Sequence, residues 1–269
     1  MELMTFHIPK SLKRLVIAPI GDIQWSGENG PTAQESLERF IGTALEMDAY
    51  FVGMGDMIDF LSPSNRRRLI SADLYDTAQD VIHEKAMELT QEVFDKFLKP
   101  TKGRWISICE GHHFYEGHGT TSDMILADML KARFVGTSAY VRIPNANFTY
   151  YHHHGVGGGV LPTSTLNKLY HLAAGLEGAD VYMLGHDTKI ASIRLSRPYP
   201  DWVKKKLIHR DIWLIRTGGF SKSNVEGHRF GNIPRGDYAE QRMLTPSPLT
   251  APIIKVDLCR ETDRIRVDI

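Results

Sequence analysis

Short apolar runs recur along the chain, and the early ones close on a glycine followed by a polar residue. These runs have the length and composition of buried strands. They cover residues 14–22, 49–56 and 104–111. Amphipathic segments with apolar residues at helical spacing follow them, at residues 32–48, 77–99 and 121–132. The alternation predicts neighbouring strands connected by helices.

The second half of the chain is richer in strands. Residues 140–143 and 147–155 predict a hairpin pair, and residues 163–174 predict a helix. Further strand candidates cover residues 180–187, 191–196, 207–220 and 251–258. Because no linker rich in proline, glycine or serine divides the chain, we expect one domain, residues 1–269. The expected fold class is α/β, with two packed mixed β-sheets flanked by helices.

Two local features complete this outline. Thr32 and Glu35 have the spacing of a capping box at the start of the first helix. The polar stretch 62–76 predicts a loop, and it carries three consecutive arginines, Arg66, Arg67 and Arg68. These arginines either lie on a solvated loop or at a helix start, which is the favoured interpretation, or they bind a substrate phosphate, for which guanidinium groups are well suited.

Composition narrows the protein class. The 269 residues include 32 Lys+Arg and 32 Asp+Glu, so no global charge favours nucleic acid or an anionic membrane. The two cysteines do not make a disulfide framework, and a reducing compartment fits them best. The N-terminus does not have the pattern of a signal peptide, and no apolar run approaches the roughly 20 residues that span a bilayer. We therefore expect a cytoplasmic protein with no membrane partner.

Residues able to bind metals or transfer protons gather where the predicted strands end. They are Asp22, Gln24, Asp56, Asp59, His112, His113, His152, His153, His154, His186 and Asp187. A single Gly-Asp after a strand is more often a turn, and three successive histidines can belong to an ordinary strand. Ligands in α/β sheets, however, bind beyond the carboxyl ends of the strands, and five such ends would converge on one site.

The ligand types indicate the chemistry of that site. Carboxylate, carboxamide and imidazole groups together suit Mn, Fe, Zn, Co or Ni. Two ions about 3.5–4 Å apart, bridged by a carboxylate, are the usual arrangement for hydrolysis of phosphate esters. The sequence therefore favours a metal-dependent hydrolase.

The order of these motifs resembles that of the calcineurin-like metallophosphoesterases. That family carries D-x-H, G-D-x-x-D, G-N-H-D/E, a His before Gly, and G-H-x-H. The counterparts here are "GDIQ", "GDMID", "GHHF", "HHHG" and "GHDT", in the same order over residues 21–188, about two thirds of the chain. The resemblance implies an α/β/β/α sandwich and a divalent-metal-dependent phosphohydrolase that uses a metal-activated water.

Each matched position takes a role from the resemblance. Asp56 would bridge two metals, and Asp22 and Gln24 would bind the first. The second metal would be bound by His112, His154 and His186. His113 would protonate the leaving oxygen or stabilise the transition state, and Asp59 would orient its neighbours.

The departures from the family pattern predict an asymmetric site. Gln24 replaces a His, His112 replaces an Asn, and Phe114 replaces the acid that steadies the catalytic His, a role left to Glu110 or Glu116. Thr188 stands where the last His ligand should be, and Asp187 beside it could substitute only from a loop. We expect one firmly bound ion and one weaker ion. Mn is the favoured metal, with Fe, Zn, Ni, Co or Mg as alternatives, and Mg or Mn suits the weak position.

The substrate class stays broad at this stage. A phosphodiesterase is favoured over a monoesterase, with a nucleotide or nucleic acid as a possible substrate, while the oligomeric state is open. Two rival hypotheses are a catalytically degenerate scaffold of the same fold and a subunit of a nucleic-acid-processing assembly.

Overall fold

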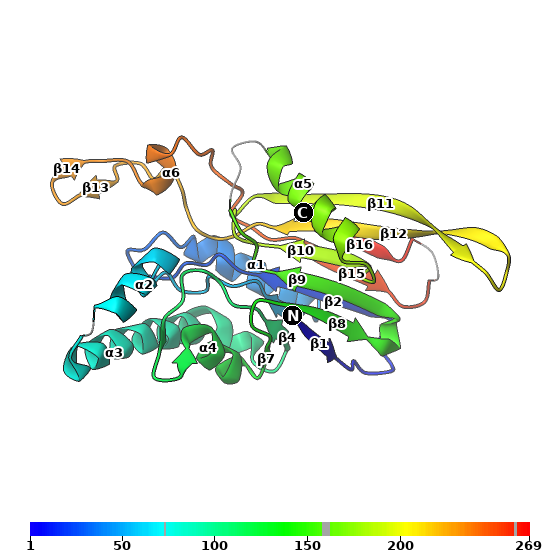
Figure 1. The fold of residues 1–269 in the computed structure, drawn as a ribbon, viewed down its shortest axis with the longest axis horizontal. Helices are drawn as coiled ribbons and strands as arrows, with labels where there is room; N and C mark the ends of the chain where they lie inside the picture. The colour runs from blue at the N-terminus through cyan, green and yellow to red at the C-terminus, as the bar shows by residue number, and fades with distance from the viewer. Residues whose placement is uncertain (73, 158–161, 261–262) are drawn as a thin grey trace.

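The protein is built on two six-stranded mixed sheets packed face to face (Figure 1). The computed structural model describes residues 1–72, 74–157, 162–260 and 263–269. In the first sheet the strand order is β16 (Ile265–Asp268), β15 (Ile253–Asp257), β2 (Arg14–Ile20), β3 (Tyr50–Gly53), β4 (Trp105–Ile108) and β7 (Arg133–Phe134). In the second it is β1 (Glu2–Thr5), β8 (Ser138–Ile143), β9 (Phe148–His153), β10 (Val181–Leu184), β12 (Lys206–Thr217) and β11 (Ile190–Asp201).

Parallel pairing at the centre of each sheet places the strand ends together. Strands β2, β3, β4 and β7 run parallel, as do β9, β10 and β12. Antiparallel strands lie toward the edges, where β15 pairs with β2 and β11 pairs with β12. Both sheets therefore present the carboxyl ends of several neighbouring strands on the same side of the molecule.

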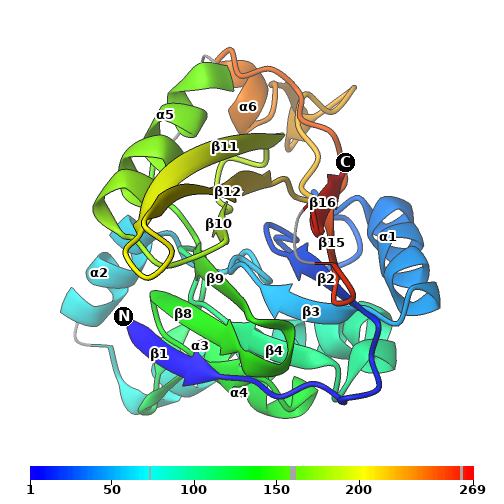
Figure 2. The same ribbon diagram turned by 90° about the vertical axis from the view of Figure 1, so that its right-hand side faces the viewer.

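Helices cover the outer faces of the two sheets (Figure 2). The first sheet is covered by α1 (Gln34–Glu46), α3 (Asp76–Val93) and α4 (Ser122–Leu130). The second is covered by α5 (Pro162–Gly175). A separate apolar core fills the space between the sheets, and it includes Ile17 and Met54 from one sheet and Val141 and Ile215 from the other. The predicted arrangement of two packed mixed sheets flanked by helices is confirmed.

Two local predictions were wrong. The stretch predicted as a loop contains helix α2 (Pro63–Ser71), which begins after Ser62, whose hydroxyl accepts from the Asn65 N–H at 3.3 Å. No capping box forms at Thr32, because α1 begins at Gln34 and its N-cap residue makes no side-chain bond. The Thr32 hydroxyl donates instead to the carbonyl of Ile23 at 2.9 Å, which fixes the loop after β2.

Several short elements were not predicted. They are β1, β7, β16, the ribbon of β5 (Glu116–Gly117) and β6 (Thr120–Thr121), the ribbon of β13 (Arg229–Phe230) and β14 (Ile233–Pro234), the 3-10 turn Pro144–Ala146, and α6 (Tyr238–Gln241). Helix α3 continues as a π-helical turn (Phe94–Leu98) and a 3-10 turn (Lys99–Thr101) up to the predicted end of the helix. Among the helices in the described part of the chain, none is long and apolar enough to cross a membrane.

Candidate metal centre at the strand ends

The chain turns sharply at the strand ends, and non-glycine residues adopt left-handed backbone angles there. The φ angle is 50° at Asp22, 52° at Gln24, 53° at Asp56, 77° at His186 and 53° at Thr188. This conformation is uncommon for residues with a side chain and is held only where the surroundings enforce it. Five of these angles fall at motif positions, which makes this edge the candidate functional site.

Glycines allow these turns to approach one another closely. A Cβ at Gly111 would lie 2.1 Å from the backbone nitrogen of Asp56, and one at Gly219 would lie 2.6 Å from the Cβ of Asp22. No side chain fits in either space. Gly111 therefore lets the loop after β4 pack against the turn after β3. Gly219 lets the segment after β12 pack against the turn after β2.

The two buried carboxylates each keep one oxygen free. Asp56 Oδ1 accepts from the backbone N–H groups of His112 and His113, the latter at 2.9 Å. Asp22 Oδ2 accepts from the His186 N–H at 2.9 Å. Asp56 Oδ2 and Asp22 Oδ1 are buried and have no hydrogen-bond partner among the described residues. Buried carboxylate oxygens without a hydrogen-bond donor call for a proton or a cation.

Three imidazoles direct nitrogen atoms at the same region. The Nδ1 atoms of His112 and His186 lie 3.2 Å apart, and His186 Nδ1 lies 3.3 Å from His154 Nε2. The ligand atoms of these three histidines lie within 4.8 Å of one another, as do those of Asp22, Asp56 and His154. The two groups share His154, so the ligand atoms form one continuous cluster.

The contact between His154 and Asp56 shows why a cation fits. His154 Nδ1 lies 2.6 Å from the carbonyl oxygen of Met54, to which it can only donate. In the neutral ring, Nε2 then carries a lone pair instead of a proton. This nitrogen lies 3.1 Å from Asp56 Oδ2, which also carries lone pairs. Two lone pairs at this distance need a proton or a metal ion between them. A backbone carbonyl that accepts from one ring nitrogen, and so leaves the other nitrogen free to bind, is also a common partner of a metal-binding histidine.

The electrostatics of the cluster follow from the same geometry. Burial raises the pKa of Asp22 to about 7. Burial would likewise lower the pKa of His154, but the Asp56 carboxylate outweighs it and raises the pKa to about 9. Burial lowers the pKa of His186 to about 4 and also lowers the pKa of His112, which favours the neutral imidazole that metals bind.

His113 stands beside this cluster as a separate acid–base group. Its Nδ1 lies 2.7 Å from Asp59 Oδ1, and its side chain is 30% exposed, so it can reach a bound substrate. The hydrogen bond to Asp59 raises the pKa of His113. The partner of His113 is thus Asp59 rather than Glu110 or Glu116, the two acids that the sequence left open for this role.

Arg66 supports the loop that carries His112 and His113. Its Nη1 donates to the carbonyls of Leu61, His112 and Phe114 at 2.7–3.1 Å. Its guanidinium also lies 3.7 Å from the centre of the Phe114 ring. These contacts join α2 to the loop after β4 and occupy the Arg66 group that the sequence offered for a substrate phosphate.

The positions around Thr188 are arranged without an additional metal ligand. The Thr188 hydroxyl donates to the Ser247 hydroxyl at 3.0 Å. Asp187 does not turn toward the cluster, because its carboxylate pairs with the buried Arg216, whose Nε lies 3.1 Å from Oδ1. Arg216 also donates to the carbonyl of Gly185 and so fixes the turn before His186.

The remaining predicted residues lie around this cluster. Gln24 is placed next to it by a bond from its N–H to the Asp56 carbonyl at 3.0 Å. Arg67 and Arg68 are exposed on α2. His118 lies against α3, where its ring is 4.6 Å from that of His83.

Sequence reasoning missed two residues that hold the site. One is Arg216, which reads as an ordinary strand position in "WLIRT". The other is Asp123, which is 1% exposed and accepts from the Gly111 N–H at 2.9 Å through Oδ2. Burial raises the pKa of Asp123 to about 7. Its position in the first turn of α4 resembles an ordinary helix start, so the sequence carried no separate signal for it.

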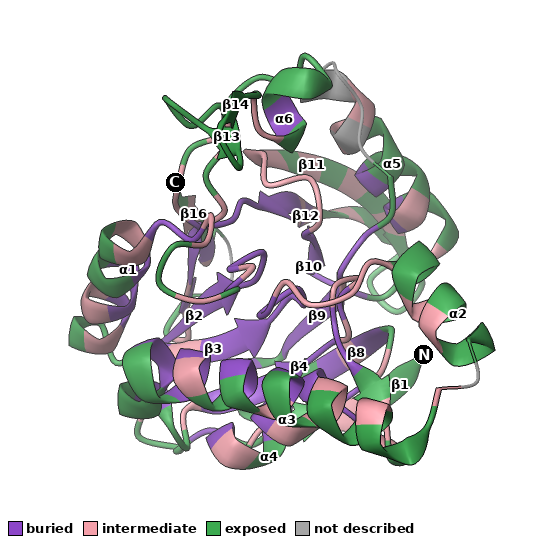
Figure 3. Ribbon diagram, turned by 90° about the vertical axis from the view of Figure 1, so that its left-hand side faces the viewer, coloured by how far each residue is buried: buried purple, intermediate pink, exposed green. Residues whose placement is uncertain are grey.

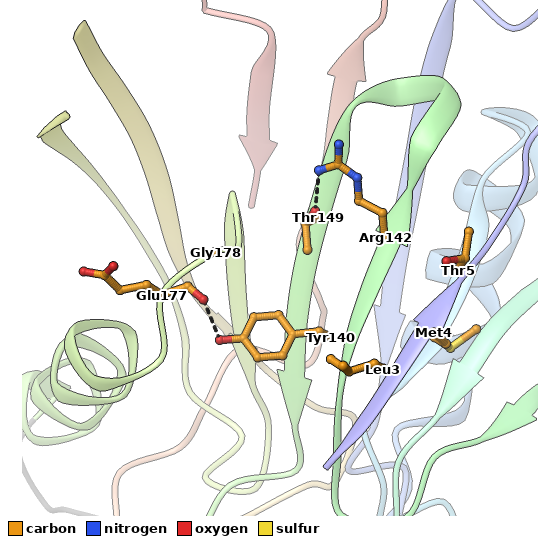
Figure 4. Close-up of a pocket in the computed structure, with 8 residues that line it drawn as sticks. All are labelled: Leu3, Met4, Thr5, Tyr140, Arg142, Thr149, Glu177 and Gly178. Carbon is orange, nitrogen blue, oxygen red and sulfur yellow. Dashed lines mark hydrogen bonds between the residues drawn. The ribbon is translucent and has the colours of Figure 1, made fainter. Parts of the chain in front are cut away.

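A pocket of about 400 Å³ lies elsewhere, at the amino end of β9 (Figure 4). Its polar groups are already satisfied within the fold. Arg142 donates to the Thr149 hydroxyl at 2.9 Å, and the Tyr140 hydroxyl donates to the Glu177 carbonyl at 3.0 Å. The candidate metal ligands lie instead at the carboxyl ends of the strands, onto which Figure 3 looks.

Comparisons with known proteins give only distant likenesses. No family model matches the sequence, and no curated protein matches it. Among solved structures, the chain is similar to a predicted phosphoesterase from Streptococcus pneumoniae TIGR4, with 10% identity, 96% of this chain and 98% of that chain covered, and a TM-score of 0.36. A metallophosphoesterase from Sphaerobacter thermophilus gives 11% identity, 94% and 87% coverage, and a TM-score of 0.31. These likenesses are too distant to assign a function.

Proposed function

We propose that this protein is a divalent-metal-dependent phosphoesterase that acts on phosphodiesters. The observation that carries the proposal is a cluster of two carboxylate oxygens without hydrogen-bond partners and three imidazole nitrogens. Beside this cluster lies His113, whose ring is held by its hydrogen bond to Asp59. A cation held by this cluster would supply a Lewis acid for the phosphoryl oxygens and a water of lowered pKa. The motif order, which resembles that of calcineurin-like metallophosphoesterases, supports the same reading.

The residues divide into a firm and a weak position. His112, His154 and His186, together with Asp56, would hold one ion firmly. Asp22, with Gln24 beside it, would offer a weaker position to a second ion, because Thr188 contributes no nitrogen. The mixture of imidazole and carboxylate suits Mn²⁺ best, with Fe, Zn, Ni, Co or Mg as alternatives.

His113 would act on the leaving group. Below its raised pKa the imidazole carries a proton that it can donate to the departing oxygen, and Asp59 holds the ring in place from Nδ1. Nε2 is then the atom that faces the substrate.

Charge around the cluster favours a diester. Arg66 Nη1 is directed at three backbone carbonyls and Arg216 pairs with Asp187, so these two guanidinium groups hold the framework of the site. A phosphodiester carries one negative charge and a phosphomonoester carries up to two. Because Arg66 and Arg216 serve the framework of the site, the singly charged diester suits it better.

The experiment is hydrolysis of bis(p-nitrophenyl) phosphate by metal-free protein to which Mn²⁺ is returned. We expect activity that depends on Mn²⁺ and that falls about 10²- to 10⁴-fold in His113→Ala. Isothermal titration should show Mn²⁺ binding preserved in His113→Ala and lost in His154→Ala. Unchanged activity in His113→Ala would refute the role given to that residue.

A catalytically degenerate scaffold is the second candidate, and Thr188 is the observation that favours it. The scaffold would be supported if the protein binds a divalent ion but hydrolyses no diester with Mn, Mg, Zn, Ni, Co or Fe.

A further inference from the structure

The segment between β12 and β15, residues 221–249, forms an arm that begins and ends beside the metal centre. Immediately before its start, the Phe220 N–H donates to the Asp22 carbonyl at 2.9 Å. At its end, the Ser247 hydroxyl accepts from Thr188 at 3.0 Å. Figure 3 looks onto the strand ends and shows β13, β14 and α6 bordering them. Both ends of the arm are thus fixed to motif residues.

The arm exposes large apolar side chains. Phe230 is 68% and Tyr238 is 71% exposed, and Ile233 and Met243 are exposed as well. Exposure of several large apolar groups on one short segment is typical of a surface that binds something. The surface is not purely apolar, because the Arg235 guanidinium lies 5.6 Å from the centre of the Phe230 ring and the Arg242 guanidinium 5.6 Å from that of Tyr238.

Helix α2 borders the same edge of the molecule and adds positive charge (Figure 3). Its exposed arginines Arg67 and Arg68 stand in a stretch, residues 61–72, without any acidic residue. Arg66 is occupied with the loop carbonyls, but Arg67 and Arg68 point from the exposed side of the helix. The arm itself is nearly neutral, with four Lys and Arg and three Asp and Glu, so α2 is the more cationic border.

We propose that the arm and α2 bind single-stranded nucleic acid as the substrate of the metal centre. Phe230 and Tyr238 provide platforms for unpaired bases, and Arg67 and Arg68 attract the backbone phosphates. This inference rests on the proposed function. A single strand combines flat apolar bases with an anionic backbone, which are the two features these borders complement. A duplex buries its base faces, so it would leave the exposed rings without partners.

A second copy of this chain is the alternative occupant of an exposed apolar surface. Each exposed ring, however, has a guanidinium beside it, and α2 brings further cations to the same edge. Stacked rings and guanidinium groups are a common way to bind bases and phosphates together. Charge complementarity therefore favours the polyanion.

The test is binding of a fluorescein-labelled oligothymidylate, followed by anisotropy in EDTA so that no strand is cleaved. We expect Phe230→Ala/Tyr238→Ala to raise Kd about tenfold or more, since each stacked base contributes measurably to affinity. Arg67→Ala/Arg68→Ala should lower the slope of log Kd against log salt by about 1.4, or about 0.7 for each lost phosphate contact. Trp202→Ala is the matched control, an 82% exposed aromatic at the far tip of the β11–β12 hairpin (Figure 1).

The outcomes separate the inference from the proposed function. If the unmodified protein hydrolyses bis(p-nitrophenyl) phosphate but oligothymidylate binding is the same in the aromatic double variant and in Trp202→Ala, this inference is overturned and the proposed function stands. If the small diester is not hydrolysed under any metal condition, the proposed function fails first. Light scattering can also show whether Phe230→Ala/Tyr238→Ala converts a dimer to a monomer. If it does, and oligothymidylate binding is unchanged, the surface binds a second copy and the inference is overturned.

Discussion

Asp123 gives the sharpest prediction about the framework of the site. Its carboxyl is 1% exposed in the first turn of α4, and burial raises its pKa to about 7 from an ordinary value of 3.8. In the unfolded chain the group is ionised above about pH 4, whereas in the folded protein it keeps its proton up to about pH 7. The folded state therefore loses stability from this group as the pH rises from about 4 to about 7.

The size of the loss follows from the difference between the two pKa values. One pKa unit corresponds to about 1.4 kcal/mol, so the penalty at pH 8 is about 4 kcal/mol of unfolding free energy. Asp123→Asn removes the ionisation, and its amide oxygen can still accept from the Gly111 N–H. The variant should be close to the wild type at pH 4 and more stable than it at pH 8 by up to this amount.

The assay is urea unfolding of metal-free protein in EDTA at several pH values between 4 and 8. Asp128→Asn is the matched control, because Asp128 is an exposed carboxyl on the same helix. If wild type and Asp123→Asn change stability in parallel across this range, the buried carboxyl does not carry the penalty and the reasoning fails.

Three further predictions concern residues around the metal centre. Asp59→Asn removes the group that raises the pKa of His113. The alkaline decline of kcat/KM should therefore shift to lower pH in this variant, and an unchanged pH profile would contradict the pairing. Arg216→Met leaves the buried Asp187 carboxylate without its partner and should cost about 3–5 kcal/mol in thermal or urea unfolding, with partial recovery when Asp187 is also replaced by Leu. Gly111→Ala places a Cβ 2.1 Å from a backbone nitrogen and should abolish Mn²⁺ binding measured by titration, whereas normal affinity would show that the loop can shift.

Much of the fold could be predicted because its signals are local. The strands before Asp22, Asp56 and His112 are apolar and close on glycine, which marks both the strand and its turn. Parallel strands bring their carboxyl ends together, and the structure places these three residues in one cluster with His154 and His186.

Other parts depend on contacts that the sequence does not display. Helix α2 buries none of its residues, so it lacks the apolar face that reveals a helix, and its polar arginines were read as a loop. The edge strands β1 and β16 are four residues each and are held by pairing with β8 and β15. The link between Asp187 and Arg216 joins positions 29 residues apart and exists only once β10 and β12 lie side by side.

The number and affinity of bound metal ions test the central claim most directly. Crystals or solutions of the metal-free protein are titrated with Mn²⁺, with calorimetry for affinity and anomalous scattering for position. One firmly bound ion among His112, His154, His186 and Asp56, with weak occupancy or none beside Asp22, is the predicted result. Two ions of equal occupancy and affinity, or no ion in this cluster at millimolar Mn²⁺, would contradict it.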